Sequence, residues 1–231
     1  MQKGDKRKQE ILDTAEEQFC RKGYEKTSVQ DILDILSLSK GSFYHHFESK
    51  EAVLEEICSR NIRERCRKAS EKAESQASVI KALNQILSDM MPFSDENKHF
   101  LLLILPVIPL QEGRSLLSCY QTVLHESYRK ILTDIINKGI QEQLFYCRNS
   151  EITADICIDM INVLWYKIIL FIQKGKNDKT ETDFQTLTEL INTYRISIES
   201  ILYAPYGSVL LLGMKELIAL DTNIRNQFNA Y

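Results

Sequence analysis

The residues with the clearest chemistry lie in residues 27–50, which read TSVQDILDILSLSKGSFYHHFESK. The polar positions in the second half of this stretch carry a cation, a hydroxyl, a phenol and two imidazoles, from Lys40, Ser42, Tyr44, His45 and His46. Side chains of these types can bond phosphate oxygens and base edges in the major groove of DNA. The stretch therefore predicts double-stranded DNA as a partner.

Two short helices must position these residues. Either Thr27 or Ser28 can cap the first helix, because Gln30 and Asp31 follow three residues beyond each in turn, as in a capping box. Ser39 offers a cap for the second helix after a turn of about three residues. The inward apolar positions are Val29, Ile32, Leu36, Leu38 and Phe43. This pattern is typical of a helix-turn-helix in which the second helix reads DNA.

Catalytic and metal-binding patterns are missing from the sequence. The eight glycines form neither G-x-G-x-x-G nor the P-loop spacing, and neither G-x-S-x-G nor H-E-x-x-H occurs. His99 and His125 lack partners at the spacing of metal ligands. We therefore expect no enzyme activity, no cofactor and no bound metal.

The remainder of the chain has the helical period almost throughout. The 231 residues contain only eight glycines and four prolines, and strand-like alternation is nowhere sustained, so we expect an all-α protein. The pattern predicts helices over residues 6–22, from Lys50 through residues 59–75, around residues 79–90, 117–135, 150–174 and 183–203, and after Gly207. It also predicts a loop over residues 175–182, with a capping box formed by Thr182 and Gln185. A boundary after residue 57 divides the chain into domains 1–57 and 58–231.

Charge and cysteine content restrict the partners and the compartment. A net charge of −3 argues against holding nucleic acid through bulk positive charge, so any binding must be local. The amino terminus is charged, and the longest apolar run, residues 101–110, is short and contains two prolines. We therefore expect a cytoplasmic protein that does not enter a membrane. The six cysteines form no Cys-x-x-Cys pair, which favours buried thiols.

The segment SLSKGSFYHHFESKEAVL resembles the amino-terminal DNA-binding domain of the TetR family of bacterial transcriptional regulators. The resemblance covers roughly residues 6–57, with the motif at about residues 28–47. It rests on the ordered set Ser39, Lys40, Gly41, Ser42, Phe43, Tyr44, His46, Phe47, Lys50 and Glu51. Two positions depart from the family pattern: Ser37 stands where the turn usually carries glycine, and Leu33 fills a position that is more often small.

The resemblance implies a set of nine residues that contact DNA: Thr27, Ser28, Gln30, Lys40, Gly41, Ser42, Tyr44, His45 and Lys50. Lys40 is the side chain most able to bond guanine acceptors, and Gly41 lets the backbone approach DNA closely. Tyr44 and His45 are expected at phosphates. Lys50 is expected to reach a phosphate from the start of the next helix. His46 and Phe47 are expected to pack inward.

The resemblance also implies a second, all-helical domain that binds a small ligand and dimerises. We expect a homodimeric repressor that releases an inverted-repeat operator when a small apolar or amphipathic ligand binds. Residues 150–174 and 183–203 are the candidates for an intersubunit four-helix bundle. The candidate pocket residues are Phe100, Leu103, Tyr120, Leu124, Tyr128, Met160 and Trp165. The same side chains could equally fill a solid core or a dimer interface.

Two other functions are compatible with the sequence. The helix-turn-helix could be only a packing module in a helical interaction protein, or the chain could be a helical enzyme whose site no motif reveals. Replacing Lys40 and Tyr44 with alanine separates the first alternative from DNA binding, because only a DNA-binding protein would lose an interaction with DNA while it stays folded. No residue pattern nominates a substrate for the second alternative.

Overall fold

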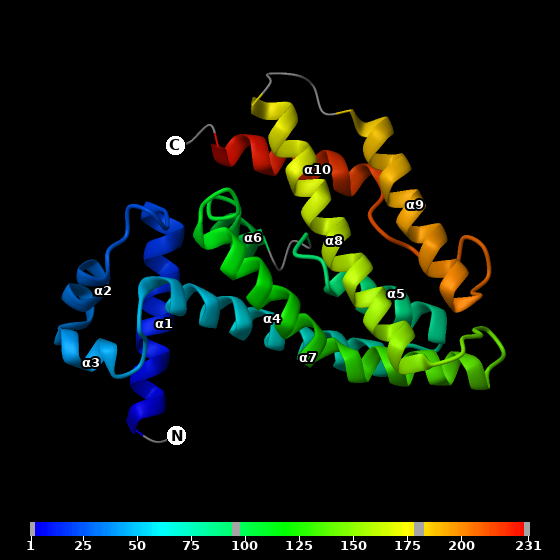
Figure 1. Ribbon diagram of the computed structural model, residues 1–231, viewed down its shortest axis with the longest axis horizontal. Coiled ribbons are helices and arrows are strands. Elements are labelled where there is room, and N and C mark those ends of the chain that lie inside the picture. Colours follow the sequence, from blue (N-terminus) through cyan, green and yellow to red (C-terminus); the bar gives the residue numbers. More distant parts are fainter. Residues whose placement is uncertain (1–2, 94–97, 178–182, 229–231) are drawn as a thin grey trace. The chain divides into compact units, whose positions relative to one another are not determined.

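The computed structural model describes residues 3–93, 98–177 and 183–228, and all regular secondary structure within these ranges is helical (Figure 1). The helices are α1 (Lys3–Lys22), α2 (Val29–Leu36), α3 (Lys40–Tyr44), α4 (Lys50–Glu74), α5 (Val79–Asp89), α6 (Lys98–Ile104), α7 (Glu112–Gln141), α8 (Ser150–Asn177), α9 (Phe184–Leu202) and α10 (Met214–Phe228). The all-α prediction is thereby confirmed. Among the described helices, none combines the length and the apolar character needed to cross a bilayer.

The chain forms two compact units, and α4 and α7 contribute residues to both of them. The first unit comprises Met1–Ile62 and Glu96–Val123, and the second comprises Arg63–Asp95 and Leu124–Tyr231. The structural division thus falls five residues beyond the predicted domain boundary and adds α6 and the start of α7 to the first unit. The functional boundary after residue 57 stays a prediction.

The first unit is built around α1. Ile11, Ala15 and Phe19 are buried on one stripe of this helix, as their spacing predicts, and Leu12 beside them is buried as well. Gly23 ends α1 in the left-handed conformation (φ 89°), and its N–H donates to the carbonyl of Phe19 at 3.0 Å. The end of α1 is therefore fixed by a residue that adopts this conformation without steric strain.

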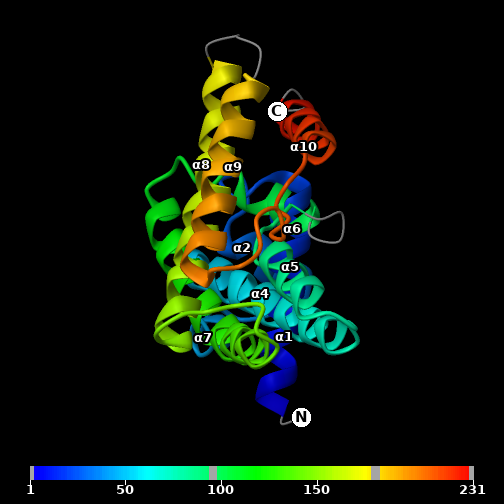
Figure 2. The same cartoon turned by 90° about the vertical axis from the view of Figure 1, so that its right-hand side faces the viewer.

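The second unit contains the long apolar helix α8 and its neighbour α9. The two helices lie side by side, with α10 packed on both (Figure 2). Leu164, Trp165 and Ile168 of α8 are buried, as the dense apolar pattern of this helix predicts. Ile191 and Ile198 of α9 are buried as well.

Some predicted bounds were wrong. Helix α8 extends to Asn177 and so occupies the first residues of the predicted loop, while residues 178–182, including the predicted cap Thr182, lie outside the described residues. The side chain of Asp183 caps α9 instead, accepting hydrogen bonds from the backbone N–H groups of Gln185 and Thr186. Helix α6, which ends at Ile104, was not predicted from the sequence.

The cysteines only partly match the expectation of buried thiols. All six lie in the described ranges and none forms a disulfide. Cys58 and Cys157 are buried, whereas the other four are partly exposed.

Candidate nucleic-acid interface

Helix α2 begins with a complete capping box. Ser28 Oγ accepts a hydrogen bond from the backbone N–H of Asp31 at 3.1 Å, and the Asp31 carboxylate accepts one from the backbone N–H of Ser28 at 2.8 Å. The other oxygen of Asp31 accepts from Lys22 Nζ at 3.0 Å, which ties α2 to the end of α1. The hydrogen bonds from Ser28 and Lys22 hold the pKa of the Asp31 carboxyl well below its usual range. The start of α2 is thus fixed by both local and tertiary contacts.

The turn between α2 and α3 depends on a serine in the left-handed conformation. Ser37 has φ 52° and ψ 46°, and the N–H of the following residue, Leu38, donates to the carbonyl of Leu33 at 3.0 Å. Ser39 then caps α3, because its Oγ accepts from the backbone N–H of Ser42 at 3.3 Å. The turn therefore forms although serine replaces glycine, at a cost of about 1 kcal/mol for the side chain.

Helix α3 has a buried face and an exposed face. Phe43 is fully buried and Phe47, just beyond the helix, is 5% exposed, with their ring centroids 6.0 Å apart. Tyr44 is 55% exposed and packs edge-on against Phe43. Lys40, Gly41 and His45 are also exposed, whereas Ser42 and His46 are half-buried. The inward packing expected of Phe47 is thus observed, and that of His46 is partial.

Gly41 faces open space. A Cβ atom added at this position would meet only Ser39 Oγ, at 4.0 Å. The fold itself therefore does not require glycine here. A larger side chain would instead project outward from the exposed face of α3.

Two of the nine predicted contact residues are directed toward the backbone at the end of α1. Thr27 is 1% exposed, and its hydroxyl donates to the carbonyl of Gly23 at 2.8 Å. This hydrogen bond stabilises the end of α1. Lys50 is half-buried, with its Nζ donating to the carbonyl of Tyr24 at 2.9 Å and lying 4.1 Å from the centroid of the Tyr24 ring. Ser28 and Gln30 lie on the exposed side of α2, where Gln30 Nε2 donates to Asp34 at 2.7 Å. The exposed set is therefore smaller than the predicted one.

Arg60 joins α4 to α1 and was not predicted from the sequence. Its guanidinium, on α4, donates to Asp13 at 2.5 Å and to Glu16 at 2.6 Å, both on α1. The only signal in the sequence is a cation and two acidic residues at helical positions far apart in the chain. Such a pattern does not by itself specify a pair.

The predicted pocket residues are mostly packed in the interior of their units. In the first unit Phe100, Leu103 and Tyr120 are buried, and the rings of Phe100 and Tyr120 stack with centroids 6.2 Å apart. In the second unit Leu124, Tyr128 and Trp165 are at most 1% exposed, and Met160 is half-buried. Their role in ligand binding stays a prediction.

The amino-terminal geometry agrees with a known family. Residues 11–57 match the family model described as bacterial regulatory proteins, tetR family. Residues 11–57 therefore form a TetR-type DNA-binding domain. The TetR-type chain is 27% identical over 171 residues to the HTH-type transcriptional repressor KstR2 of Mycobacterium tuberculosis, which covers 70% of this chain and 82% of the relative. It is 31% identical over 143 residues to the uncharacterized HTH-type transcriptional regulator YerO of Bacillus subtilis, covering 58% of this chain and 48% of that one.

Two solved structures of bacterial transcriptional regulators share the fold of most of this chain. A TetR-family transcriptional regulator from Pectobacterium atrosepticum superposes with a TM-score of 0.61 at 17% identity, over 87% of this chain and 97% of that one. The transcriptional regulator FadR from Bacillus subtilis was solved in complex with stearoyl-CoA. It superposes with a TM-score of 0.52 at 19% identity, over 86% of this chain and 99% of that one. The TetR-type chain is a DNA-binding transcriptional regulator, and a motif that serves only as a packing module is not favoured.

Proposed function

We propose that this chain is a ligand-responsive repressor that binds an inverted-repeat operator as a homodimer. The observation that carries the proposal is the exposed face of α3, where Lys40, Gly41, Tyr44 and His45 point away from a base of two buried phenylalanines. A helix with polar donors on one side and core contacts on the other suits insertion into a major groove.

Each exposed residue has a proposed role. Lys40 bonds guanine acceptors, and Gly41 and Ser42 allow the first turn of α3 to approach the bases. Tyr44 and His45 bond phosphates on one side of the groove.

Ser28 and Gln30 contact the DNA backbone from the start of α2. Lys50 can reach a phosphate only by leaving the Tyr24 carbonyl, and Thr27 acts as a support rather than a contact.

An apolar stripe on the second unit supports the homodimer. Ile152, Ile156, Val163 and Leu170 repeat at intervals of four and seven residues along α8, and each is more than 40% exposed. Ile196 on α9 is 43% exposed. Exposed apolar side chains at this spacing favour packing against a second helix pair, which gives a four-helix bundle. Two-fold symmetry would then place the two α3 helices about 34 Å apart, so that they read an inverted repeat.

Repression would end when a ligand favours a state with the wrong spacing between the two α3 helices. The shift can be no larger than the difference in ligand affinity between the two states. The helical second unit is the proposed location of this ligand. If saturating ligand left operator affinity unchanged at every salt concentration, the proposed release of the operator by ligand would be contradicted.

The contact face is tested with a double variant, Lys40→Ala with Tyr44→Ala. Losing one base contact and one phosphate contact should weaken operator binding about 100-fold, because each contact contributes about 1–3 kcal/mol. The matched control is Lys215→Ala with Tyr206→Ala, which removes an exposed lysine and tyrosine from the second unit. Binding is measured by fluorescence anisotropy of a labelled operator, and dimer mass by light scattering. Equal operator affinity in both variants would contradict the assignment of α3 as the reading helix.

A further inference from the structure

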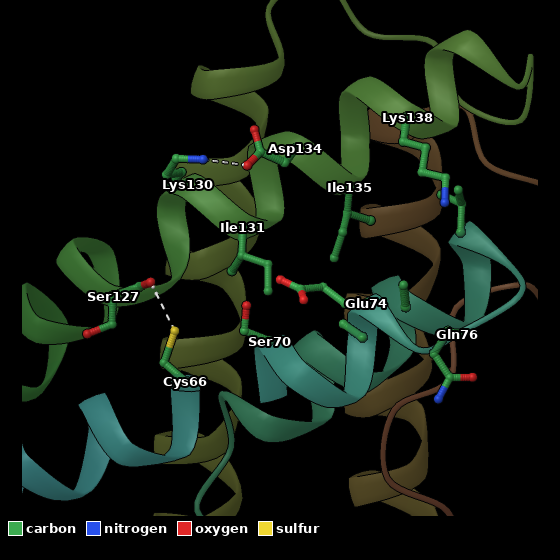
Figure 3. Close-up of a pocket in the computed structure, with 13 residues that line it drawn as sticks. Cys66, Ser70, Glu74, Gln76, Ser127, Lys130, Ile131, Asp134, Ile135 and Lys138 are labelled. Carbon is green, nitrogen blue, oxygen red and sulfur yellow. Dashed lines mark hydrogen bonds and ion pairs between the residues drawn. The ribbon is translucent and has the colours of Figure 1, made fainter. Parts of the chain in front are cut away.

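A cleft of about 500 Å³ lies within the second unit, between the end of α4, the start of α5 and the second half of α7 (Figure 3). This volume is in the range of small-molecule sites. None of the seven pocket residues predicted from the sequence lines it. Those members of the predicted set that are in this unit, such as Tyr128 and Trp165, fill its interior instead.

The cleft exists because small side chains face one another across it. Ser70 and Ala73 on α4 and Ala82 on α5 leave the space that larger residues would fill. Ala73, Ala82 and Val79 are buried, and so is Ile135 on α7. The floor of the cleft therefore offers apolar contact to a bound molecule.

Charges around the cleft are unevenly placed. Lys130 and Asp134 pair with each other at 2.8 Å along α7. The Glu74 carboxylate is directed from α4 toward Ile131, into the space between α4 and α7 (Figure 3), and has no hydrogen-bond or ion-pair partner among the described residues. Lys138 stands at the opposite end of the cleft from Cys66. Glu74 is thus the acidic side chain that is directed into the space between α4 and α7.

One further feature adds negative charge beside Glu74, and another side chain of the lining adds none. Glu74 is the last residue of α4, where the unpaired carbonyl groups of the helix carry partial negative charge. The Cys66 thiol donates to the carbonyl of Ser127 at 3.0 Å, and burial raises its pKa to about 11. Cys66 is therefore a neutral donor and adds no charge to the cleft.

We propose that this cleft is the effector site and that it binds an amphipathic organic cation, with the charged group at Glu74 and the apolar part along α5 and α7. The inference rests on the proposed ligand-responsive function and names the ligand class for it. A carboxylate beside an apolar floor favours an ammonium group that carries a hydrocarbon chain, because the chain leaves water on the floor while the ammonium group meets an opposite charge at the exposed Glu74.

Three probes of equal chain length test the charge that the site prefers. Octyltrimethylammonium, octanoate and octanol are titrated into the 231-residue chain by calorimetry, below the concentrations at which the two ions form micelles and octanol separates from water. We expect octyltrimethylammonium to bind most tightly and to lower operator affinity at least about tenfold at saturation. Glu74→Gln should weaken its binding about fivefold, the range of an exposed ion pair, while the matched variant Lys138→Gln should not. Ala82→Leu should weaken the binding of all three probes, because the larger side chain would fill the space above the floor.

Each opposite result would overturn the assignment. Tighter binding of octanoate, lost in Lys138→Gln, would make the site one for amphipathic anions. Octyltrimethylammonium binding that neither Glu74→Gln nor Ala82→Leu changes would place its site elsewhere. Operator binding without any probe is measured in the same samples. If it is intact while the cation fails to bind, only the cation site is wrong, whereas its absence from every form contradicts the proposed function itself.

Discussion

The α2–α3 motif and the α4–α5–α7 cleft arrange polar and apolar side chains in opposite ways. In the motif, the aromatic residues Phe43 and Phe47 are buried and the polar residues project outward from one short helix. In the cleft, apolar residues from three helices form the floor and the charged residues stand around it. A surface that enters a groove of fixed shape needs outward donors, whereas a site that encloses a small molecule needs an inward apolar floor.

The two regions also differ in how their geometry is fixed. The motif is determined by neighbouring residues, since Ser28, Ser37 and Ser39 set the bounds of both helices. The cleft depends on which side chains of distant segments meet. Substitutions should therefore act separately on the two regions, and the predictions below follow the expected size of the effect.

The largest effect is expected from Ile156→Glu on the exposed stripe of α8. If α8 pairs with its copy, two carboxylates are buried without partners, which costs several kcal/mol and should raise the dimer dissociation constant about 1,000-fold. Ile218→Glu on α10, a position of similar exposure, is the control and should leave the dimer intact. Sedimentation equilibrium measures both. Dissociation of the control alone would place the interface on α10.

Phe43→Ala tests the base of the reading helix. Phe43 is fully buried, so its truncation should lower the free energy of unfolding of the first unit by about 3–5 kcal/mol. Urea denaturation followed by circular dichroism measures the loss. A loss below 1 kcal/mol would contradict the packing of α3 on this side chain.

Gly41→Ala separates folding from DNA binding. Because the added Cβ meets only Ser39 Oγ, at 4.0 Å, and alanine favours helix, stability should be unchanged or slightly higher. Operator affinity should nevertheless fall about tenfold if the backbone approaches DNA at this residue. The melting temperature and the operator dissociation constant are compared with those of the unmodified chain. Unchanged operator affinity would show that the backbone does not approach DNA closely at Gly41.

The smallest effect is expected from Ser37→Gly. Glycine adopts the left-handed conformation without the side-chain strain, so the substitution should stabilise the first unit by up to about 1 kcal/mol. The midpoint of urea unfolding reports the change. Destabilisation would show that the serine side chain supports the turn.

The sequence predicted the motif better than the second unit for physical reasons. Caps, turn residues and the alternation of Phe43 with Tyr44 act over a few residues, so their pattern reveals both helices and the exposed face. The burial of Thr27 was not predictable in this way, because its hydroxyl bonds the carbonyl of Gly23, which depends on how α1 ends. Lys50 likewise finds Tyr24 through the tertiary fold.

Periodicity could not locate the cleft because it marks inward-facing positions but does not say whether facing side chains fill the space between helices. Tyr128 and Trp165 were predicted to line the pocket because their side chains are large and aromatic, yet they fill the core. The space lies where Ser70, Ala73 and Ala82 are small. Small residues on facing helices are thus the better sequence signal for a cavity, although the fold must be known to show that they face each other.

Selection of bound sequences from a pool of randomised DNA duplexes tests the central claim most directly. The purified 231-residue chain is incubated with the pool at near-physiological salt, and the retained duplexes are sequenced. The account predicts enrichment of one inverted repeat whose half-sites lie about one helical turn apart or a multiple of it. No enrichment, or enrichment of a single unrepeated site by a protein shown to be a folded dimer in the same sample, would contradict it.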